Sequence, residues 1–379
     1  MVAKEQLSGT RGEHPTSADG KTDQTRILVT GGSGFLGQHL VHTFSSQRGC
    51  SVMSTYSTTS RLQSPGCVTR RMDLLDHDSM VAVVQEFKPE VVVHTAGVRG
   101  LKDTELSHRI NIGGLVSFLD VLDAQLGEGG YNFSYISTDL VYAHSDGVIS
   151  EHDAELNPIG TYATEKVEAE ELLQTRRQRT GLNLAIVRGP FIYGWNLYHD
   201  TSYNNNFFIQ MVTKLSAGES PTLFDDEFRT PVYIEDASYI IVGAALKFAR
   251  EPQAEGSRMF NLTSGEVITR YEFGLEICKA FGFDCKLVDR KTLHDGTPEM
   301  AELAKRRPQR IHLSDEIVRT ELGLKPHGVQ GALKILAHEN QKRERNTDGH
   351  FHVSSPALPP KRQRTVNETQ GTAMQEITI

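Results

Sequence analysis

The sequence lacks any long hydrophobic segment. Its apolar runs, such as residues 91–93 and 240–246, are far shorter than the ~20 residues that a helix needs to cross a bilayer. The first 25 residues also lack the apolar stretch of a secretory signal. We therefore expect no membrane partner and a cytoplasmic protein in a reducing compartment.

Cysteine and positive charge are also scarce, and both shortages exclude classes of site. The four cysteines form no CxxC pair and no spacing with histidine that suits a metal, so we expect buried thiols and no metal site. The 40 Lys and Arg residues are outnumbered by 48 Asp and Glu residues. The net charge of -8 gives no general electrostatic attraction to nucleic acid, so we expect no nucleic-acid partner.

The two ends of the chain are polar. Residues 1–25 are rich in Gly, Ser, Thr and charged residues and cannot bury enough apolar surface to offset the entropy of ordering. We expect a disordered arm there and a disordered tail over residues 341–379. The tail carries Lys361, Arg362 and Arg364 after prolines. We favour a solvated tail, and a nuclear-import signal is the alternative.

Between these ends, short β-branched runs alternate with longer helical stretches, which is typical of βαβ units. We predict an α/β fold with a doubly wound, Rossmann-like parallel sheet. Its dinucleotide-binding domain would span residues 26–190 and be completed by residues 232–250. Residues 191–231 and 251–338 would form a smaller, mainly C-terminal substrate lobe. The expected strands are 27–30, 51–56, 90–95, 133–137 and 183–188, and the expected helices are 36–46, 79–87, 110–126, 162–175 and one that a capping box starts at Thr269.

A glycine-rich turn follows the first expected strand. The segment GGSGFLG places Gly31, Gly34 and Gly37 between that strand and the next helix. Gly31 would permit the tight turn, Gly34 the close approach of backbone to a pyrophosphate, and Gly37 close packing of helix on strand. Because strand, glycines and helix follow in this order, we favour a dinucleotide site over a purely structural turn. The remaining expected contacts in this segment are Ser33, Phe35 and Leu36.

The residues after the glycines favour NADP(H) over NAD(H). NAD sites usually place an acidic residue about 20 positions beyond the glycines. No acidic residue occurs from Gln38 to Met72, whereas arginines occur at positions 48, 61, 70 and 71. We predict that Arg61 contacts the 2'-phosphate of NADP(H), with NAD(H) as the alternative cofactor. Otherwise Arg61 is a charge on a surface loop.

Tyr162 and Lys166 lie four residues apart in a helical stretch and therefore share one face. A nearby ammonium favours phenolate, so we expect Lys166 to lower the pKa of Tyr162 and fit it for proton transfer. An exposed helical pair is the alternative.

Two polar residues complete this site. Thr138 ends an expected strand, and ligands of open parallel sheets bind beyond the carboxyl ends of the strands. Its hydroxyl would hydrogen-bond a substrate carbonyl while Tyr162 delivers the proton. Asn111, in the helical run INIGGLVSFLDVL, would orient a water or a backbone group behind Lys166, or bond its own helix.

Several segments carry a family resemblance. They are YISTDLVY (135–142), GTYATEKVEAEELL (160–173), VRGPFIYG (187–194) and RTPVYIEDA (229–237). These segments resemble the extended short-chain dehydrogenase/reductase family, and within it the dTDP-4-dehydrorhamnose reductase branch. That branch also contains the regulatory beta subunit of methionine adenosyltransferase, to which three further segments are similar: FKPEVVVHTAG (87–97), NLTSGEVITRYEF (261–273) and RRPQRIHLSDEI (306–317).

The resemblance implies roles for individual residues. It makes Thr138, Tyr162 and Lys166 the catalytic set, with Asp139 as the acidic residue after the threonine. The segment HTAG at 94–97 departs from the usual Asn/His-Ala-Ala-Ala form, and His94 there could be a core strand residue. The other implied contacts are Asp73 and Leu74 beside the adenine, Ala96, Gly97 and Asn111 along the cofactor, Pro190 near the nicotinamide, and Asn206 and Arg229 at the substrate.

The leading hypothesis from the resemblance is an NADPH-dependent reductase of a nucleotide-linked 4-keto-6-deoxy sugar. The alternative from another class is a non-catalytic regulatory subunit that binds a dinucleotide and the catalytic subunit of methionine adenosyltransferase. A nucleotide-sugar epimerase is a second alternative. A sugar dehydratase is disfavoured because Leu140, and not glutamate, follows Asp139. Homodimer formation is left open.

Overall fold

The computed structural model describes residues 24–58, 64, 66–142, 145–151, 155–197, 206–251 and 258–346. Its centre is a sheet of seven strands in the order β11-β6-β5-β4-β1-β2-β3, and each neighbouring pair runs parallel. The sheet order reverses between β1 and β4, and the carboxyl ends of parallel strands form a ligand crevice at such a point. The strands are β1 (Thr25–Thr30), β2 (Cys50–Tyr56), β3 (Cys67–Arg71), β4 (Val91–His94), β5 (Asn132–Thr138), β6 (Asn183–Gly189) and β11 (Arg258–Asn261).

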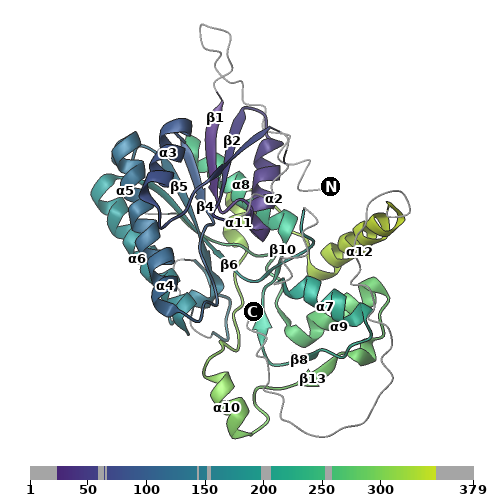
Figure 1. The fold of residues 1–379 in the computed structure, drawn as a ribbon. Helices are drawn as coiled ribbons and strands as arrows, with labels where there is room; N and C mark the ends of the chain where they lie inside the picture. Colours follow the sequence, from purple (N-terminus) through teal and green to yellow (C-terminus); the bar gives the residue numbers. More distant parts are fainter. Residues whose placement is uncertain are drawn as a thin grey trace, which may run out of the picture.

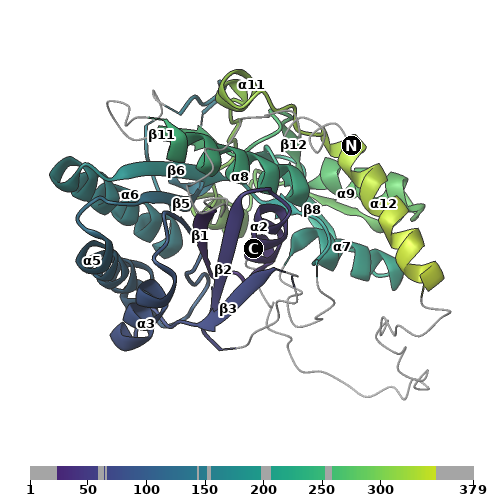
Figure 2. The same cartoon turned by 90° about the horizontal axis from the view of Figure 1, so that it is seen from above.

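Helices cover both faces of this sheet, as Figure 1 and the view from above in Figure 2 show. Successive residues of a strand point to opposite faces. Ile27 and Val29 therefore pack with α2 and α8, whereas Leu28 packs with α3, α5 and α6. This arrangement confirms the predicted doubly wound α/β fold. The helices are α2 (Phe35–Ser45) and α8 (Ile234–Arg250) on one face, with α11 (Glu316–Glu321), and α3 (His77–Phe87), α5 (Gly114–Leu126) and α6 (Thr161–Thr180) on the other.

A smaller lobe packs beside the sheet and has an aromatic core. Tyr193, Phe208 and Phe273 are fully buried in it. The capping box is confirmed, because the Thr269 hydroxyl accepts a hydrogen bond from the Glu272 N–H (3.1 Å) and the Glu272 carboxylate accepts one from the Thr269 N–H (2.9 Å). The lobe contains the strand pairs β7 (Ile192–Tyr193) with β10 (Val232–Tyr233), β8 (Thr222–Phe224) with β13 (Asp289–Lys291), and β9 (Phe228–Arg229) with β12 (Ile268–Thr269), and the helices α7 (Phe207–Ser216), α9 (Arg270–Phe281), α10 (Pro298–Ala304) and α12 (Val329–Asn346).

Short helical segments connect these elements. They are α4 (Thr104–His108), a π-helical turn (Arg109–Gly113) and two 3-10 helices (Asp139–Val141 and Cys285–Leu287). The π-helical turn leads directly into α5, so the expected helix over 110–126 is interrupted near its start. Such turns are often found at functional sites.

Two strands of the sheet were not expected. Both β3 and β11 lie at the edges, and β3 (CVTRR) is polar and largely exposed, so neither has the continuous apolar run of a buried parallel strand. The prediction placed all of residues 251–338 in the substrate lobe. It is wrong for β11, because this strand belongs to the central sheet.

The C-terminal boundary also differs from the expectation. Helix α12 continues to Asn346, so the prediction of a disordered tail is wrong for residues 341–346. Residues 1–23 and the basic cluster at 361–364 lie outside the described residues. Within the part of the chain that the structure describes, no helix combines the length and apolar character needed to span a membrane.

Candidate active site

The glycine turn leads from β1 into α2. Gly31 has a φ of 66°, a conformation that favours glycine, and a Cβ there would lie 2.9 Å from the Ala96 Cα. A Cβ at Gly37 would lie 2.7 Å from the Gly32 Cα. Gly37 therefore lets α2 pack closely on the turn that directly follows β1.

The N-terminus of α2 presents backbone N–H groups to the crevice. Gly34 is the N-cap, and no side chain among the residues that the structure describes caps the first turn. Such a terminus attracts anions through its free amides and the helix dipole. Ser33, Phe35 and Leu36 are half-buried around it. These residues fit the phosphates of a dinucleotide cofactor.

The expected contacts at the two ends of the cofactor follow β3 and β6. After β3, Asp73 is half-buried and accepts a hydrogen bond from the Leu75 N–H (3.0 Å). Leu74 is buried against α5, where a Cβ at Gly114 would lie 2.7 Å from its Cβ. Pro190 is buried between β6 and β7. Their contacts with the cofactor stay predictions.

The predicted 2'-phosphate contact, Arg61, lies outside the described residues. Another arginine ends β3, beside the last residue of β2. Arg71 pairs in register with Tyr56, and its Nε donates a 3.1 Å hydrogen bond to the Ser57 carbonyl. The Arg71 side chain is 57% exposed, so its guanidinium is accessible to a ligand.

Asn111 holds the loop that follows β4. Its Oδ1 accepts a hydrogen bond from the Val98 N–H (2.9 Å), and its Nδ2 donates to the Val98 carbonyl (3.0 Å). The same Nδ2 donates to the Glu165 carboxylate in α6 (2.7 Å). A Cβ at Gly97 would lie 3.0 Å from the Asn111 Oδ1, so glycine permits this close approach. Asn111 thus hydrogen-bonds the backbone of the loop after β4, which is one of the two expected alternatives. It also connects this loop to α6, the helix that carries Tyr162.

His94 is a core strand residue. Its Nδ1 lies 3.0 Å from the Thr30 hydroxyl, and its ring stacks on Phe118, Phe133 and Tyr135. Burial lowers its pKa to about 3, so the imidazole is neutral. His94, in the segment HTAG that differs from the usual family form, is therefore a packed and uncharged residue of the sheet.

Thr138 and Asp139 lie at the carboxyl end of β5. The Thr138 hydroxyl caps the following 3-10 helix and donates a 3.3 Å hydrogen bond to the Asp139 Oδ1. Asp139 is 3% exposed, and its Oδ2 has no hydrogen-bond partner among the described residues. Burial raises the pKa of Asp139, and the charges of Arg229, Arg99 and Arg270 oppose this rise. The positive charges of three arginines therefore act on Asp139.

Tyr162 and Lys166 lie on α6, but they interact differently from the expectation. Lys166 Nζ donates to the Ile136 carbonyl (2.8 Å) and the Tyr135 hydroxyl (3.1 Å), and it lies 5.8 Å from the centre of the Tyr162 ring. Burial raises the pKa of Tyr162, and the opposing cation is Arg99, 5.1 Å from the ring centre. The pKa of Tyr162 is therefore raised overall, and not lowered as expected. The exposed-pair alternative is wrong, because both side chains are partly buried.

Glu165 is a buried carboxylate that the sequence pattern did not single out. It is 4% exposed, and its Oε2 accepts the Asn111 hydrogen bond, whereas its Oε1 has no hydrogen-bond partner in the described part of the chain. Burial is the main cause of the raised Tyr162 pKa, and Glu165 adds to it. Burial lowers the pKa of Lys166 to about 8, and the charges of Glu170 and Glu165 oppose this. Glu165 lies between Tyr162 and Lys166 in the segment YATEK, and its position there could have marked it as part of the site.

The expected substrate contacts, Asn206 and Arg229, use their polar atoms inside the protein. Asn206 accepts a hydrogen bond from the Phe208 N–H as the N-cap of α7, and it donates one to the Gly194 carbonyl, both at 3.0 Å. Arg229 is 4% exposed and donates to the Pro308 carbonyl (2.6 Å). Both residues shape the lobe, and their direct contact with a substrate stays a prediction.

Arg229 belongs to a buried cationic cluster, which we define as Glu227, Arg229, Arg270 and Arg307. The Glu227 carboxylate lies 3.2 Å from Arg229, 3.7 Å from Arg270 and 2.9 Å from Arg307. Arg270 lies over two aromatic rings, and its Nε and Nη1 have no hydrogen-bond partner among the described residues. Three guanidinium groups facing one carboxylate, with unused donors, suit an anionic ligand. The sequence reasoning found Arg229 and missed Arg270 and Arg307, although RRPQR at 306–310 is a basic run in an acidic chain.

The sheet order, the glycine turn and the Tyr-x-x-x-Lys helix define the class: this is an extended short-chain dehydrogenase/reductase fold. The chain belongs to the family described as RmlD substrate binding domain, whose model matches residues 25–342. The resemblance seen in the sequence is therefore confirmed.

Two curated relatives represent the two kinds of protein that the sequence resembles. The methionine adenosyltransferase 2 subunit beta of Danio rerio is 26% identical over 305 residues, which cover 79% of this chain and 85% of that protein. The dTDP-4-dehydrorhamnose reductase of Aggregatibacter actinomycetemcomitans is 24% identical over 331 residues, which cover 82% of this chain and 98% of that protein.

Solved structures share the fold. A dTDP-4-dehydrorhamnose reductase from Clostridium acetobutylicum superposes with a TM-score of 0.62 at 19% identity, covering 84% of this chain and 100% of that one. A dTDP-glucose 4,6-dehydratase from Bacillus anthracis, in complex with NAD, superposes with a TM-score of 0.69 at 19% identity, covering 85% of this chain and 98% of that one.

Proposed function

We propose that this protein is an NADPH-dependent reductase of a nucleotide-linked 4-keto-6-deoxy sugar. The observation that supports the proposal most is the link between Tyr162 and the glycine turn. Helix α6 carries Tyr162 and is joined through Glu165 and Asn111 to the loop after β4, and that loop packs on Gly31. A dinucleotide on the turn and a proton donor on α6 would therefore share one crevice.

Tyr162 is suited to donate a proton. Because burial raises its pKa, the phenol is protonated at neutral pH, which is the state that reduction of a carbonyl requires. A bound dihydronicotinamide supplies the hydride to the carbonyl carbon. Tyr162 then protonates the developing alkoxide oxygen, while the Thr138 hydroxyl donates a hydrogen bond to the same oxygen.

Lys166 provides a fixed positive charge beside this phenol. With a pKa of about 8 it is mostly protonated at neutral pH, and its hydrogen bonds to Ile136 and Tyr135 hold it in place. Its charge stabilises the phenolate that remains after Tyr162 has given up its proton. The family resemblance also assigns Lys166 to the nicotinamide ribose.

The buried cationic cluster suits the diphosphate of a nucleotide-linked sugar. Asp139 lies next to the proposed catalytic Thr138, and the charges of Arg229 and Arg270 oppose the rise that burial causes in its pKa. The cluster therefore lies close to the reacting centre. The unused N–H donors of Arg270 match phosphate oxygens in geometry and charge. A diphosphate held there would leave the attached sugar near Thr138.

The test is NADPH oxidation with a panel of dTDP-, UDP- and GDP-linked 4-keto-6-deoxy sugars, comparing the wild type with Tyr162→Phe. We expect turnover of at least one sugar by the wild type and its loss in the variant. Equal rates for the two proteins would eliminate the proposed acid. An epimerase would interconvert sugars without net consumption of NADPH.

The preference for NADPH has its own test. Since no acidic residue occurs from Gln38 to Met72 and the exposed Arg71 lies beside the end of β2, NADPH should bind more tightly than NADH. We expect Arg71→Gln, Arg61→Gln or both to narrow the difference between the two dissociation constants. Tighter binding of NADH by the wild type would overturn the assignment.

A second candidate is supported by the relative from Danio rerio, which is a subunit of methionine adenosyltransferase. In that case the chain binds a dinucleotide and a methionine adenosyltransferase catalytic subunit without catalysing reduction. Co-elution with that subunit in size-exclusion chromatography, together with no NADPH oxidation on the sugar panel, would favour this candidate. Turnover without co-elution would favour the reductase.

A further inference from the structure

The loop after β4 brings a positive charge to the phenol of Tyr162. Arg99 lies in this loop, and its guanidinium carbon lies over the Tyr162 ring, 5.1 Å from the ring centre. The Lys166 Nζ lies 5.8 Å from the same centre. The proposed proton donor therefore has two cations beside it, and they come from different elements of the fold.

The position of Arg99 is set by the residue before it. The Val98 N–H donates a hydrogen bond to the Asn111 Oδ1 (2.9 Å), and the Val98 carbonyl accepts one from the Asn111 Nδ2 (3.0 Å). Because the same Nδ2 also donates to Glu165 on α6, the loop is joined to the helix that carries Tyr162. The contacts of Asn111 therefore hold Arg99 over the phenol ring.

The Arg99 guanidinium has donors to spare. Arg99 is exposed, and neither a hydrogen bond nor an ion pair to another described residue engages its guanidinium. The Lys166 ammonium, in contrast, donates to the Ile136 carbonyl and the Tyr135 hydroxyl. The contact with the Tyr162 ring is therefore the interaction for which the loop positions Arg99.

Several charged or titratable groups besides Arg99 face this phenol. They are Lys166 and Glu165 on α6, Tyr135 in β5 and Asp139 after β5. Burial raises the pKa of Tyr162, the charge of Arg99 opposes this rise, and the charges of Asp139 and Glu165 add to it. Burial also raises the pKa of Asp139, and Arg99 is one of the charges that oppose that rise. Arg99 thus acts on the phenol and on a carboxylate beside it.

We infer that Arg99 is a further residue of the proposed reductase site, where its positive charge stabilises the phenolate that forms when Tyr162 gives up its proton. In that step the phenol O–H bond breaks, the electron pair stays on the phenolate oxygen, and the proton completes the new O–H group of the sugar. A cation over the ring favours the phenolate over the neutral phenol. Arg99 acts through Tyr162 and is therefore a positioning residue. This inference rests on the proposed function.

The test compares the wild type with Arg99→Ala and Arg99→Lys in NADPH oxidation with a sugar that the wild type reduces. We expect kcat to fall about tenfold in Arg99→Ala, because a positive charge next to the phenolate is lost. The KM for NADPH should stay within about twofold of the wild type, since the charge is needed in the chemical step. Arg99→Lys keeps the charge and should recover most of the lost rate.

Chemical rescue separates charge from structure. Guanidinium chloride at millimolar concentration should raise the kcat of Arg99→Ala at least about threefold, because the ion can enter the exposed space that the side chain leaves. Urea has nearly the same shape and no charge, so it should have no effect. Both compounds unfold proteins only at molar concentrations. A merely structural role of Arg99 would not distinguish them.

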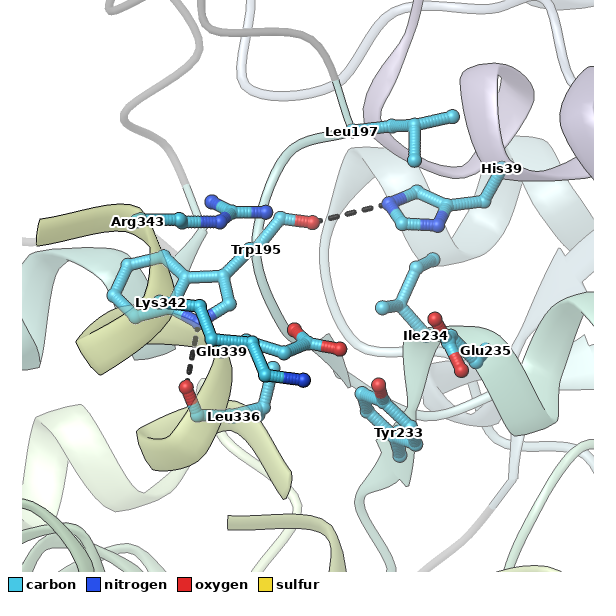
Figure 3. A pocket seen from close by; sticks show the side chains of 10 residues that line it. All are labelled: His39, Trp195, Leu197, Tyr233, Ile234, Glu235, Leu336, Glu339, Lys342 and Arg343. Carbon is cyan, nitrogen blue, oxygen red and sulfur yellow. Dashed lines mark hydrogen bonds between the residues drawn. The ribbon is translucent and has the colours of Figure 1, made fainter. Parts of the chain in front are cut away.

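Arg343→Ala is the matched control. The Arg343 guanidinium also lies over an aromatic ring, 5.3 Å from the centre of the Trp195 ring (Figure 3). It lines a cavity of about 250 Å³ between α2, α8 and α12, and neither Tyr162 nor Lys166 lines that cavity. The kcat of this variant should equal that of the wild type, with and without guanidinium.

Two results would overturn the role of Arg99 and leave the reductase in place. They are equal kcat values for the wild type and Arg99→Ala, and equal responses of Arg99→Ala to guanidinium and urea. If the wild type reduces no sugar of the panel, the proposed function itself fails, and the role of Arg99 fails with it.

Discussion

The Lys166 ammonium lies 5.8 Å from the centre of the Tyr162 ring and forms no hydrogen bond with the Tyr162 hydroxyl. Its donors go to the Ile136 carbonyl and the Tyr135 hydroxyl, so the sheet fixes its position. The proposed action of the lysine on the phenol is therefore through its charge and not through a hydrogen bond. In the proposed reaction, Tyr162 donates the proton and Lys166 supplies the nearby positive charge.

Replacing Tyr162 by phenylalanine tests the first function. We expect kcat to fall about 10²- to 10⁴-fold, because the variant keeps the ring and loses only the proton donor. The dissociation constant for NADPH should stay within about twofold of the wild type. Steady-state kinetics and fluorescence titration measure the two quantities. Tyr135→Phe is the control, since it removes a partner of Lys166 and keeps the acid, and its loss of kcat should be much smaller.

The pH dependence of kcat/KM tests the second function. Burial lowers the pKa of Lys166 to about 8. The ammonium is charged below this pH and neutral above it, so kcat/KM should be level towards neutral pH and fall as the pH rises through about 8. In Lys166→Arg the charge persists, and the fall near pH 8 should disappear even if the overall rate is lower. A profile that is flat in the wild type through this region would contradict the assignment.

Glu165 should influence the pH at which kcat/KM falls. Its charge opposes the burial that lowers the pKa of Lys166, so its removal should lower that pKa further. In Glu165→Gln we expect the basic fall of kcat/KM to begin at lower pH, with the Asn111 contact retained through the amide oxygen. Glu168→Gln is the matched control, because this partly buried carboxylate on the same helix pairs with His108 (3.0 Å). Identical profiles for the wild type and Glu165→Gln would show that the residue is only structural.

The fold could be predicted where apolar runs are continuous. The strands β1, β2, β4, β5 and β6 are buried by helices on both faces. They are rich in aliphatic or aromatic residues, with serine and threonine interspersed in β2 and β5, and each was predicted to within one or two residues. The edge strands β3 and β11 are covered less completely and carry polar residues, so no such run marks them.

The candidate site could be predicted only where local spacing decides the geometry. The glycine turn and the pairing of Tyr162 with Lys166 depend on neighbours within one turn of helix. The raised pKa of Tyr162 depends instead on burial, and the opposing charge of Arg99 is brought close only by the folded structure. Arg270 and Arg307 likewise meet Glu227 from separate segments of the lobe, and no single-sequence pattern contains that contact.

Arg270 provides the test of the buried cationic cluster. Its Nε and Nη1 have no hydrogen-bond partner in the described structure, and such orphaned donors cost about 1–3 kcal/mol each in a protein interior. In Arg270→Met we therefore expect the KM for the nucleotide-linked sugar to rise at least tenfold, while the free energy of unfolding stays level or increases.

The KM and the free energy of unfolding are expected to respond differently, because Arg270→Met removes a ligand contact and an unsatisfied buried charge together. Arg229 and Arg307 still neutralise Glu227 in the variant. Arg290→Met is the control, because Arg290 lies in the same lobe with a side chain that is 69% exposed and pairs with Asp225. Its KM should be unchanged. Kinetics with the sugar and urea denaturation measure the two effects. If Arg270→Met unfolds more easily and keeps its KM, the cluster holds the lobe together and does not bind the anion.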